Sequence, residues 1–295
     1  MKKPDEESSV LQLHEDPAFF REAVIFTAAE TRFLARLIEK DYFCSLLLSY
    51  LASSDRLLVF KGGTCLAKVH AGFYRLSEDL DFAIPSPVNA SRTERRSLSS
   101  GLKDAITRIP GKLSVFRLVE PLTGANNSTQ YGSVIGYTSL VNRQQETIKI
   151  EVGLREPLLT HVHIGAVRTI MLNPVSGRPI LPELSVPCLS LNEAMAEKLR
   201  AALTRREAAI RDFYDIDYAV RKLSFLPLDK QILELVRQKL AVPGNDPVDV
   251  SRERLETLRR QVDAELRPVL RTVDFAEFDL DRAFTTMAKV AVAVR

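Results

Sequence analysis

Hydrophobic positions recur along the chain with two different periods, which predict a mixed first part and a helical last part. Residues 17–51 place apolar side chains, Phe26 and Phe33 among them, at helical spacing, so we expect two packed helices there. The polar residues 1–16 before them predict an end that frays. Residues 57–60 form a short, wholly apolar run, which is typical of a buried strand.

A glycine pair, Gly62 and Gly63, ends this strand and predicts a tight turn. Thr64 is suited to cap the N-terminus of a helix that we expect to reach about residue 71. Residues 77–82 are expected to form the next strand. The order of strand, glycine turn, helix and strand indicates a small α/β unit.

The following segments predict a helix and a hairpin beside this unit. The polar residues 85–100 indicate a loop, and residues 102–109 indicate a helix. Strands are expected at residues 113–119 and 134–141, joined by a turn at residues 124–128 that contains glycine and two asparagines.

Strict alternation of polar and apolar residues over 147–152 predicts a further strand, whose polar face carries Glu151. Prolines and β-branched residues are frequent over 161–187, which indicates a short hairpin or an extended connector leading out of the sheet. The spacing is helical from Ser190 onward, and Ser190 with Glu193 fits a capping box.

These elements predict an α+β protein with two domains. Residues 1–185 are expected to form a mixed β-sheet flanked by helices, with a connecting hairpin near 161–183, and residues 186–295 a helical domain that closes the active-site cleft. The 295 residues, 45% of them hydrophobic, supply enough apolar material for both cores.

Composition argues against several classes of protein. No stretch approaches the roughly 20 apolar residues of a membrane helix, and the N-terminus is acidic, so we expect a soluble, cytoplasmic protein without a membrane partner. The cysteines Cys44, Cys65 and Cys188 lie far apart in apolar contexts, which favours buried thiols over a disulfide framework or zinc. His161 and His163 lack a cysteine or carboxylate at zinc spacing, which favours an ordinary surface pair. The formal charge of +3 does not by itself indicate a nucleic-acid partner.

Two aspartates in the second predicted strand carry the strongest chemical signal. Asp79 and Asp81 stand two residues apart, so a strand projects both from one face. Two such anions repel each other by about 2–4 kcal/mol in a protein surface environment, and divalent cations turn that repulsion into attraction. The pair therefore predicts a site for Mg²⁺ or Mn²⁺, with Glu151 as a candidate third carboxylate. Taken alone, an Asp-x-Asp pair at a strand edge is more often a solvated turn.

The glycine turn adds a phosphate site to this prediction. Backbone N–H groups of Gly62 and Gly63 can approach phosphates closely, and the N-terminus of the following helix favours negative charge. Lys61 precedes the glycines and no G-x-x-x-x-G-K-[ST] spacing exists, so the loop is not a Walker A motif. The competing interpretation of the turn, taken alone, is a tight connection without a ligand.

A lysine and two aspartates in the helical part are candidates for the same site. Lys198 lies within the apolar stripe of its helix, where an inward-facing ammonium needs an anion. Asp212 and Asp215 stand one turn apart on the next helix, and we expect Lys198 and Asp212 to meet near the cleft. The competing interpretations are a lysine stem that covers apolar surface and aspartates that serve the helix start.

Together these motifs resemble those of the AbiEii-like nucleotidyltransferases, the toxin halves of bacterial AbiE-type toxin–antitoxin systems and distant relatives of the DNA polymerase β superfamily. The resemblance covers most of the chain in four motifs that follow in order. Their residues here are Lys61, Gly62, Gly63, Thr64 and Leu66; Arg75, Ser77, Asp79 and Asp81; Glu197, Lys198 and Leu199; and Arg211, Asp212, Tyr214 and Asp215. Many relatives carry lysine where this chain has Arg211, and Glu151 is matched by strand position more than by a distinctive local motif.

The resemblance implies a role for each candidate residue. The metal ligands would be Asp79, Asp81 and Glu151. The catalytic residues would be Asp79, Asp81, Glu151, Lys198 and Asp212. The nucleotide would be held by Lys61, Gly62, Gly63, Thr64, Ser77, Lys198 and Asp215.

The resemblance also implies a function, the transfer of NMP from NTP to RNA by a toxin. The expected acceptor is the 3′ end of tRNA, whose modification would block aminoacylation and growth until a cognate AbiEi-like antitoxin opposes it. Two alternatives stay open, namely transfer to a small molecule or protein hydroxyl, and a nucleotide- or RNA-binding module without catalysis. Arg205, Arg206 and the arginines of residues 252–260 are either solvated helix faces or contacts for RNA phosphates.

Overall fold

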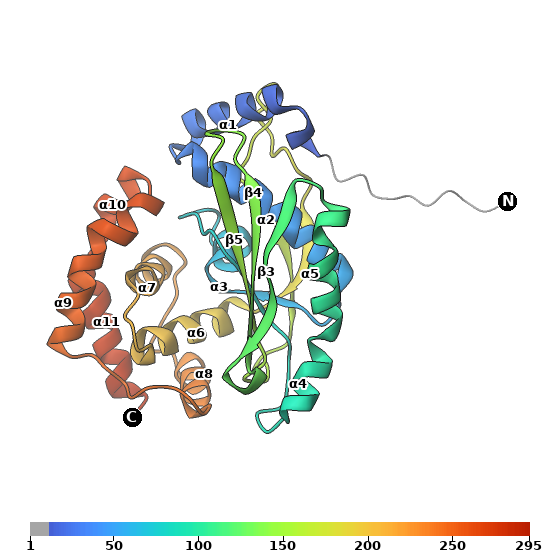
Figure 1. The fold of residues 1–295 in the computed structure, drawn as a ribbon. Coiled ribbons are helices and arrows are strands. Elements are labelled where there is room, and N and C mark those ends of the chain that lie inside the picture. The colour runs from blue at the N-terminus through green and yellow to red at the C-terminus, as the bar shows by residue number, and fades with distance from the viewer. Residues whose placement is uncertain (1–11) are drawn as a thin grey trace.

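A seven-stranded mixed sheet forms the centre of the first part of the chain (Figure 1). The structure is a computed structural model that describes residues 12–295, so most of the segment expected to fray lies outside the described residues. The strands lie in the order β3-β4-β5-β2-β1-β7-β6. Their bounds are β1 (Val59–Lys61), β2 (Leu80–Ala83), β3 (Phe116–Ala125), β4 (Gln130–Thr138), β5 (Gln145–Gly153), β6 (His163–Val167) and β7 (Leu184–Cys188).

Helices surround the sheet and make up the whole of the chain after β7, which confirms the α+β class expected from the sequence. The α-helices are α1 (Pro17–Thr31), α2 (Ala35–Ser54), α3 (Gly62–Cys65), α4 (Arg92–Leu98), α5 (Ser100–Lys112), α6 (Leu191–Thr204), α7 (Ile210–Lys222), α8 (Lys230–Ala241), α9 (Arg252–Gln261), α10 (Thr272–Glu277) and α11 (Leu280–Ala293). A π-helical turn, η2 (Leu66–His70), continues α3, and η4 (Val262–Leu266) continues α9. None of the helices within residues 12–295 is long and apolar enough to cross a bilayer.

The two helices expected over residues 17–51 are α1 and α2. Asp16 caps α1 by accepting hydrogen bonds of 3.1 Å from the backbone N–H groups of Ala18 and Phe19, and Pro17 occupies the first helical position. α2 packs against α5 and supplies much of the core beneath the sheet, where Phe43 meets Tyr137 at a ring-centroid distance of 4.3 Å.

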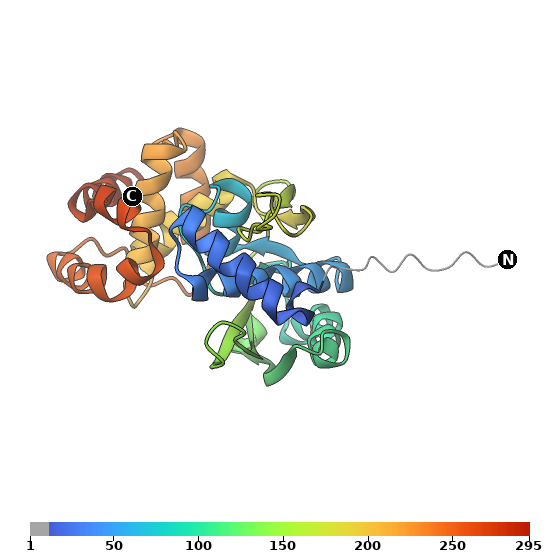
Figure 2. The same ribbon diagram turned by 90° about the horizontal axis from the view of Figure 1, so that it is seen from above.

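The helices α6–α11 have an apolar core of their own beside the sheet part (Figure 2). Leu66, Ala67 and Tyr74, which come from the chain between β1 and β2, are buried in this second core. The segment that follows the glycine turn therefore packs against the helical part.

The structure corrects the prediction that the 161–187 segment leads out of the sheet. β6 and β7 pair antiparallel there, and β7 pairs parallel with β1, so the hairpin completes the sheet. The segment 85–100, expected to be a loop, contains α4, which Ser91 begins with a full capping box. The capping box of Ser91 and Glu94 was visible in the sequence. The helix was missed because it has only about two turns and little apolar periodicity.

Two predicted helix caps differ from the structure. Thr64 lies inside α3, whose N-cap position is Lys61, and its buried hydroxyl donates to the Asp79 carbonyl. Ser190 accepts a hydrogen bond from the Glu193 N–H as expected, but the Glu193 side chain turns away from the cap. It accepts hydrogen bonds from the N–H groups of Leu159 and Thr160 and thereby anchors the connector after β5.

A buried ion pair between η2 and α2 gives a stability prediction. Lys68 Nζ lies 2.5 Å from Asp41 Oδ1, and both side chains are almost fully buried. Lys68→Met leaves the Asp41 carboxylate without its cation in the core, so we expect the free energy of unfolding, measured in urea, to fall by about 3–5 kcal/mol. The control Arg252→Met breaks an exposed pair with Glu256 and should cost less than about 1 kcal/mol. Equal losses in the two variants would contradict the prediction.

Candidate active site

The predicted carboxylates stand at the middle of the sheet on neighbouring strands. β2 lies between β1 and β5, so Asp81 has Lys61 as its backbone partner on one side and Glu151 on the other. Asp79 precedes β2, which begins at Leu80, whereas the sequence predicted it within the strand. Asp79, Asp81 and Glu151 nevertheless line one pocket, so the structure brings the three carboxylates together.

The glycine turn approaches these carboxylates so closely that a side chain would not fit. Gly62 has a φ of 75°, in the region that favours glycine, and a Cβ at this position would overlap Asp81 Oδ2. A Cβ on Gly63 would overlap the Arg75 guanidinium and lie 3.1 Å from Ser77 Oγ. Because α3 begins at this turn, its first N–H groups have no intrahelical partners and lie beside the acidic strand.

The pocket joins the acidic strand ends to basic side chains of the helical part. Its volume is about 310 Å³. Its lining residues are Gly63, Arg75, Ser77, Asp79, Asp81, Glu151, Lys198, Arg205, Ala209, Arg211, Asp212 and Glu265. All five residues predicted to be catalytic are in this set. Lys61 and Gly62 line an adjoining pocket of about 180 Å³ that shares Asp81, Glu151, Lys198 and Asp212.

The aspartates of this pocket are short of positive charge. Burial and the neighbouring Glu151 carboxylate raise the pKa of Asp81 to about 6, and burial likewise raises the pKa of Asp79. Glu151 forms an ion pair with Lys149 from its own strand, so a metal would compete with that lysine for the carboxylate. A donor set made only of carboxylate oxygens suits a hard divalent cation such as Mg²⁺ or Mn²⁺.

Lys198 meets the aspartates of the next helix, as the sequence predicted. Its Nζ lies 2.7 Å from Asp212 Oδ1 and 2.9 Å from Asp215 Oδ2. Asp212 Oδ2 lies 3.2 Å from Arg205 Nη1, but it accepts no aligned hydrogen bond from any group of residues 12–295. Asp212 therefore holds Lys198 with one oxygen and keeps acceptor capacity on the other.

Asp215 stands behind the pocket wall and not in it. Its side chain is fully buried, and it accepts hydrogen bonds from Arg75 Nε at 2.6 Å, from Arg75 Nη2 at 2.8 Å and from the Tyr74 hydroxyl. Burial by itself would raise the pKa of Asp215, but Arg75 and Lys198 together hold it well below its usual value. These contacts favour a role in positioning Arg75 and Lys198 over the predicted contact with the nucleotide.

Two other residues predicted to bind nucleotide already have partners. The Thr64 hydroxyl is buried on the Asp79 carbonyl, which leaves the backbone N–H of Thr64 as the group that a phosphate could use. Lys61 Nζ lies 2.8 Å from Glu197 Oε2 on α6. Lys61 therefore ties the glycine turn to the helical part.

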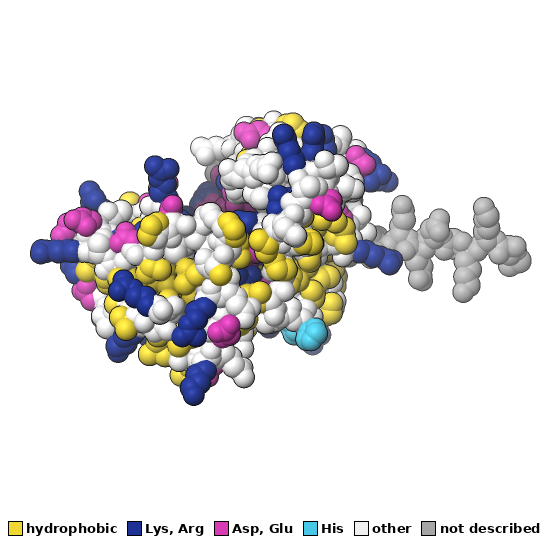
Figure 3. All heavy atoms as spheres, turned by 90° about the horizontal axis from the view of Figure 1, so that it is seen from below, with side chains coloured by type: hydrophobic (Ala, Val, Ile, Leu, Met, Phe, Trp, Pro, Cys, Tyr) yellow, Lys and Arg dark blue, Asp and Glu magenta, His cyan; other side chains and the backbone are white. Residues whose placement is uncertain are grey.

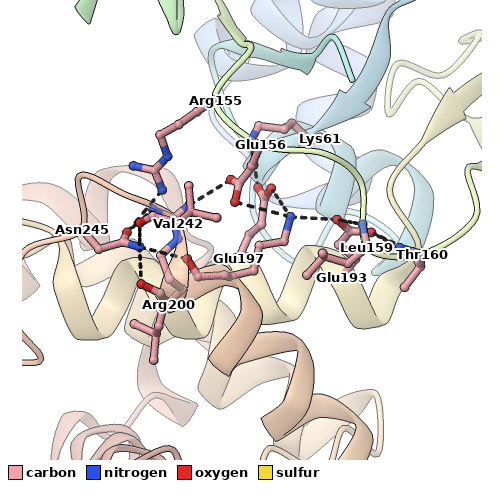
Figure 4. Close-up of polar contacts among 12 residues, drawn as sticks. Lys61, Arg155, Glu156, Leu159, Thr160, Glu193, Glu197, Arg200, Val242 and Asn245 are labelled. Carbon is pink, nitrogen blue, oxygen red and sulfur yellow. Dashed lines mark hydrogen bonds and ion pairs between the residues drawn. The ribbon is translucent and has the colours of Figure 1, made fainter. Parts of the chain in front are cut away.

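Glu197 belongs to a buried charge network that sequence patterns did not reveal (Figure 4). Lys239 of α8 lies 2.7 Å from Glu193 Oε1 and 3.3 Å from Glu197 Oε1. Burial would raise the pKa of Glu197, but Lys61 and Lys239 lower it to about 2. Glu197 stands in the third motif, whereas Lys239 gave no signal because it lies 42 positions away on another helix.

A second missed group fixes the loop that carries Asp79. Glu78 Oε2 accepts hydrogen bonds from Arg36 Nη1 at 2.7 Å and from Lys40 Nζ at 3.0 Å, both on α2. Burial would raise the pKa of Glu78, but these cations lower it to about 2. The sequence places Glu78 next to Asp79, which was a signal that could have identified it. Its partners Arg36 and Lys40 lie far upstream, so no local pattern indicated the pairing.

The order and geometry of these motifs agree with a comparison against known families. The model of the family described as "Nucleotidyl transferase AbiEii toxin, Type IV TA system" matches residues 46–288. The chain belongs to the AbiEii family of nucleotidyltransferase toxins. The match spans the glycine turn, the carboxylate strands and the helical part, and it confirms the family resemblance and enzyme class expected from the motifs.

A solved structure of another nucleotidyltransferase toxin shares the fold of this AbiEii-family chain at low sequence identity. The nucleotidyltransferase toxin MenT4 from Mycobacterium tuberculosis H37Rv is similar with a TM-score of 0.57 and 20% identity, over 93% of this chain and 99% of that one. JHP933 from Helicobacter pylori matches with a TM-score of 0.44 and 18% identity, over 88% of each chain. No functionally curated protein matches the chain.

The buried position of Asp215 can be tested by stability. Asp215→Asn removes the anion shared by Arg75 and Lys198, so we expect a loss of about 3–5 kcal/mol in the free energy of unfolding. Asp79→Asn removes a carboxylate whose ionised form is unfavourable, so this control should keep or raise the stability. Urea unfolding of both variants is the measurement, and an Asp215→Asn protein as stable as the wild type would contradict the positioning role.

Proposed function

We propose that this AbiEii-family toxin transfers NMP from an NTP to RNA, with Mg²⁺ or Mn²⁺ bound by Asp79, Asp81 and Glu151. The observation that carries the proposal is that one pocket contains both these three carboxylates and a set of basic side chains. The basic residues are Arg75, Lys198, Arg205 and Arg211. Carboxylates suit the metal ions, and the basic groups suit the charge of a triphosphate.

Different residues of the chain would bind the phosphates, offset their charge and accept the proton of the acceptor hydroxyl. The free N–H groups at the start of α3 and the Ser77 hydroxyl can bind phosphate oxygens, and Lys198 offsets their charge. The acceptor oxygen bonds to the α-phosphorus as the bond to pyrophosphate breaks, and Glu151 serves as a metal ligand or receives the proton of the acceptor hydroxyl. When bound, the metal ions lower the pKa of that hydroxyl and stabilise the leaving pyrophosphate.

An RNA acceptor, with the 3′ end of tRNA as its expected part, is supported by the family and by the arginines at the pocket. Arg205 and Arg211 line the pocket and can contact phosphates of an acceptor strand. The arginines of α9 are less suited to this task. Arg259 pairs with Asp281 and Arg252 with Glu256, while Arg254 donates to backbone carbonyls. Figure 3 likewise shows Lys and Arg side chains spread over one face of the molecule and not gathered in one tract.

The acceptor and nucleotide can be identified in one assay. Purified protein is incubated with total tRNA, Mg²⁺ and each α-³²P-labelled NTP in turn, and the products are resolved on a denaturing gel. We expect label on tRNA with one or more NTPs, and none above background with Asp79→Ala, because that variant lacks a proposed metal ligand. The control Asp104→Ala removes an exposed aspartate of α5 and should label like the wild type.

Each outcome of this assay is informative. Label on a small molecule or on protein, with tRNA unlabelled, rejects the RNA acceptor and keeps the transferase. Equal labelling by wild type and Asp79→Ala rejects the proposed metal site. Silence of the folded wild type with every NTP and acceptor pool would favour a binding module instead.

The raised pKa of Asp81 predicts how pH and metal act on stability. Without metal, folded Asp81 keeps its proton up to about pH 6, whereas an unfolded aspartate loses it near about pH 4, so its contribution to stability falls as pH rises through this window. Mg²⁺ binds the ionised form, so it should raise the melting temperature more at about pH 7.5 than at about pH 5. Asp81→Asn should remove most of both effects in thermal-shift measurements. A Mg²⁺ shift that is the same at both pH values would contradict the assignment.

A further inference from the structure

A second group of side chains that could bind a metal ion lies at the C-terminal end of α3, whereas the glycine turn lies at its N-terminal end. Cys65, His70 and Cys188 each offer one donor atom, and these atoms lie within 4.8 Å of one another. Within residues 12–295 this is the single group of three cysteine, histidine or carboxylate side chains so arranged. Cys65 ends α3, His70 ends η2 and Cys188 ends β7, so the cluster joins the helix of the glycine turn to the sheet.

The two sulfurs lie within 4.8 Å of each other and of the donor nitrogen of His70. Both cysteines are free thiols and fully buried. Cysteine sulfur and histidine nitrogen are the ligands that zinc binds most often in structural sites, and this group supplies both.

His70 is oriented in the way that a metal-binding histidine requires. Its Nε2 lies 3.0 Å from the Leu189 carbonyl oxygen, and a carbonyl can only accept a hydrogen bond. Nε2 of the neutral ring therefore carries the hydrogen, which leaves the lone pair on Nδ1 for a metal. A backbone carbonyl that binds the second ring nitrogen is the usual outer partner of a metal-bound histidine.

A second histidine stands at the open side of the cluster. His163 on β6 is the backbone partner of Cys188 on β7, and its ring centroid lies 6.0 Å from that of His70. The sulfurs are buried, whereas His70 is half-buried and His163 is exposed, so an ion can enter from the histidine side. As partners in an antiparallel pair, His163 and Cys188 project from the same face of the sheet, which places His163 beside the cluster as a candidate fourth ligand.

We propose that Cys65, His70 and Cys188, with His163 as the fourth ligand, form a structural Zn²⁺ site. Two thiolates and two imidazoles are a common ligand set for tetrahedral zinc. The ion would link α3 and η2 to the β6–β7 hairpin. Its ligand Cys65 lies three residues after Gly62. This site is separate from the carboxylates of β2 and β5, and the proposal does not depend on nucleotidyl transfer.

Cys65 and Cys188 are free and buried, as the sequence predicted. The proposal departs from the sequence analysis in assigning zinc to them and in giving His163 a role beyond that of an ordinary surface residue. The sequence shows a cysteine and a histidine five positions apart, but Cys188 lies 123 positions beyond Cys65 and only strand pairing brings it back.

Metal content of matched cysteine variants tests the site. Protein purified under reducing conditions is loaded with Zn²⁺, dialysed and analysed for zinc per chain by mass spectrometry of the folded protein. We expect one Zn²⁺ in the wild type and in Cys44→Ala, which removes the third buried cysteine, and loss of the ion in Cys65→Ala and in Cys188→Ala. Circular dichroism confirms that each variant is folded.

Cobalt spectra and the histidines make the test independent of variant folding. Wild-type protein loaded with Co²⁺ should show the thiolate charge-transfer and tetrahedral visible bands. His163→Ala should weaken Zn²⁺ binding at least about tenfold, while His161→Ala should not change it. Wild-type protein with three titratable thiols and no bound Zn²⁺ or tetrahedral Co²⁺ would overturn the proposal, as would a Cys65–Cys188 disulfide under the same reducing conditions or full zinc in both cysteine variants.

Discussion

A buried ion pair, Arg75 with Asp215, joins the helical part of the chain to the sheet part, and the geometry of the candidate active site depends on it. Arg75 comes from the segment before β2 and Asp215 from α7, and their two hydrogen bonds are parallel and short. Lys198 shares the same carboxylate, so both basic walls of the pocket are held by one anion. Tyr74 adds stacking on Tyr218 at a ring-centroid distance of 4.3 Å. Separating the two parts would leave buried charges without partners, which costs a large free energy. The two walls of the pocket are therefore held at a fixed position relative to each other.

The charges around the site follow a pattern that distinguishes structural anions from those left for a ligand. Glu78 and Glu197 are partly buried, and each has two cations that lower its pKa to about 2. Asp79 and Asp81 are buried to a similar degree, yet their pKa values rise. The carboxylates that hold loops and helices in place have neighbouring cations. Asp79 and Asp81, at the start of the central strand, have too little positive charge nearby to offset their burial. The proposed divalent cation would supply the positive charge that Asp79 and Asp81 lack.

Local patterns in the sequence were sufficient for much of this architecture. Apolar periodicity located α1 and α2, the glycine pair located the turn, and alternation placed Glu151 on the polar face of β5. The pairing of Lys198 with Asp212 followed from an inward-facing lysine and a short connection between helices. What could not be predicted depends on long-range pairing. The hairpin of β6 and β7 belongs to the sheet because β7 pairs parallel with β1. The cations on Glu78 and Glu197 come from segments that are remote in the sequence.

The glycine turn places the proposed phosphate-binding groups directly beside the proposed metal ligands. Asp81 Oδ2 fills the space that a side chain at position 62 would take, so the turn and the carboxylate strand are in contact without any spacer. The Thr64 hydroxyl binds the Asp79 carbonyl, which fixes the start of β2 to the same helix. A phosphate held by the N–H groups of the turn would therefore lie directly beside the carboxylates. Because transfer requires the α-phosphate and the metal ions in one place, a turn without side chains provides the proximity that the reaction needs.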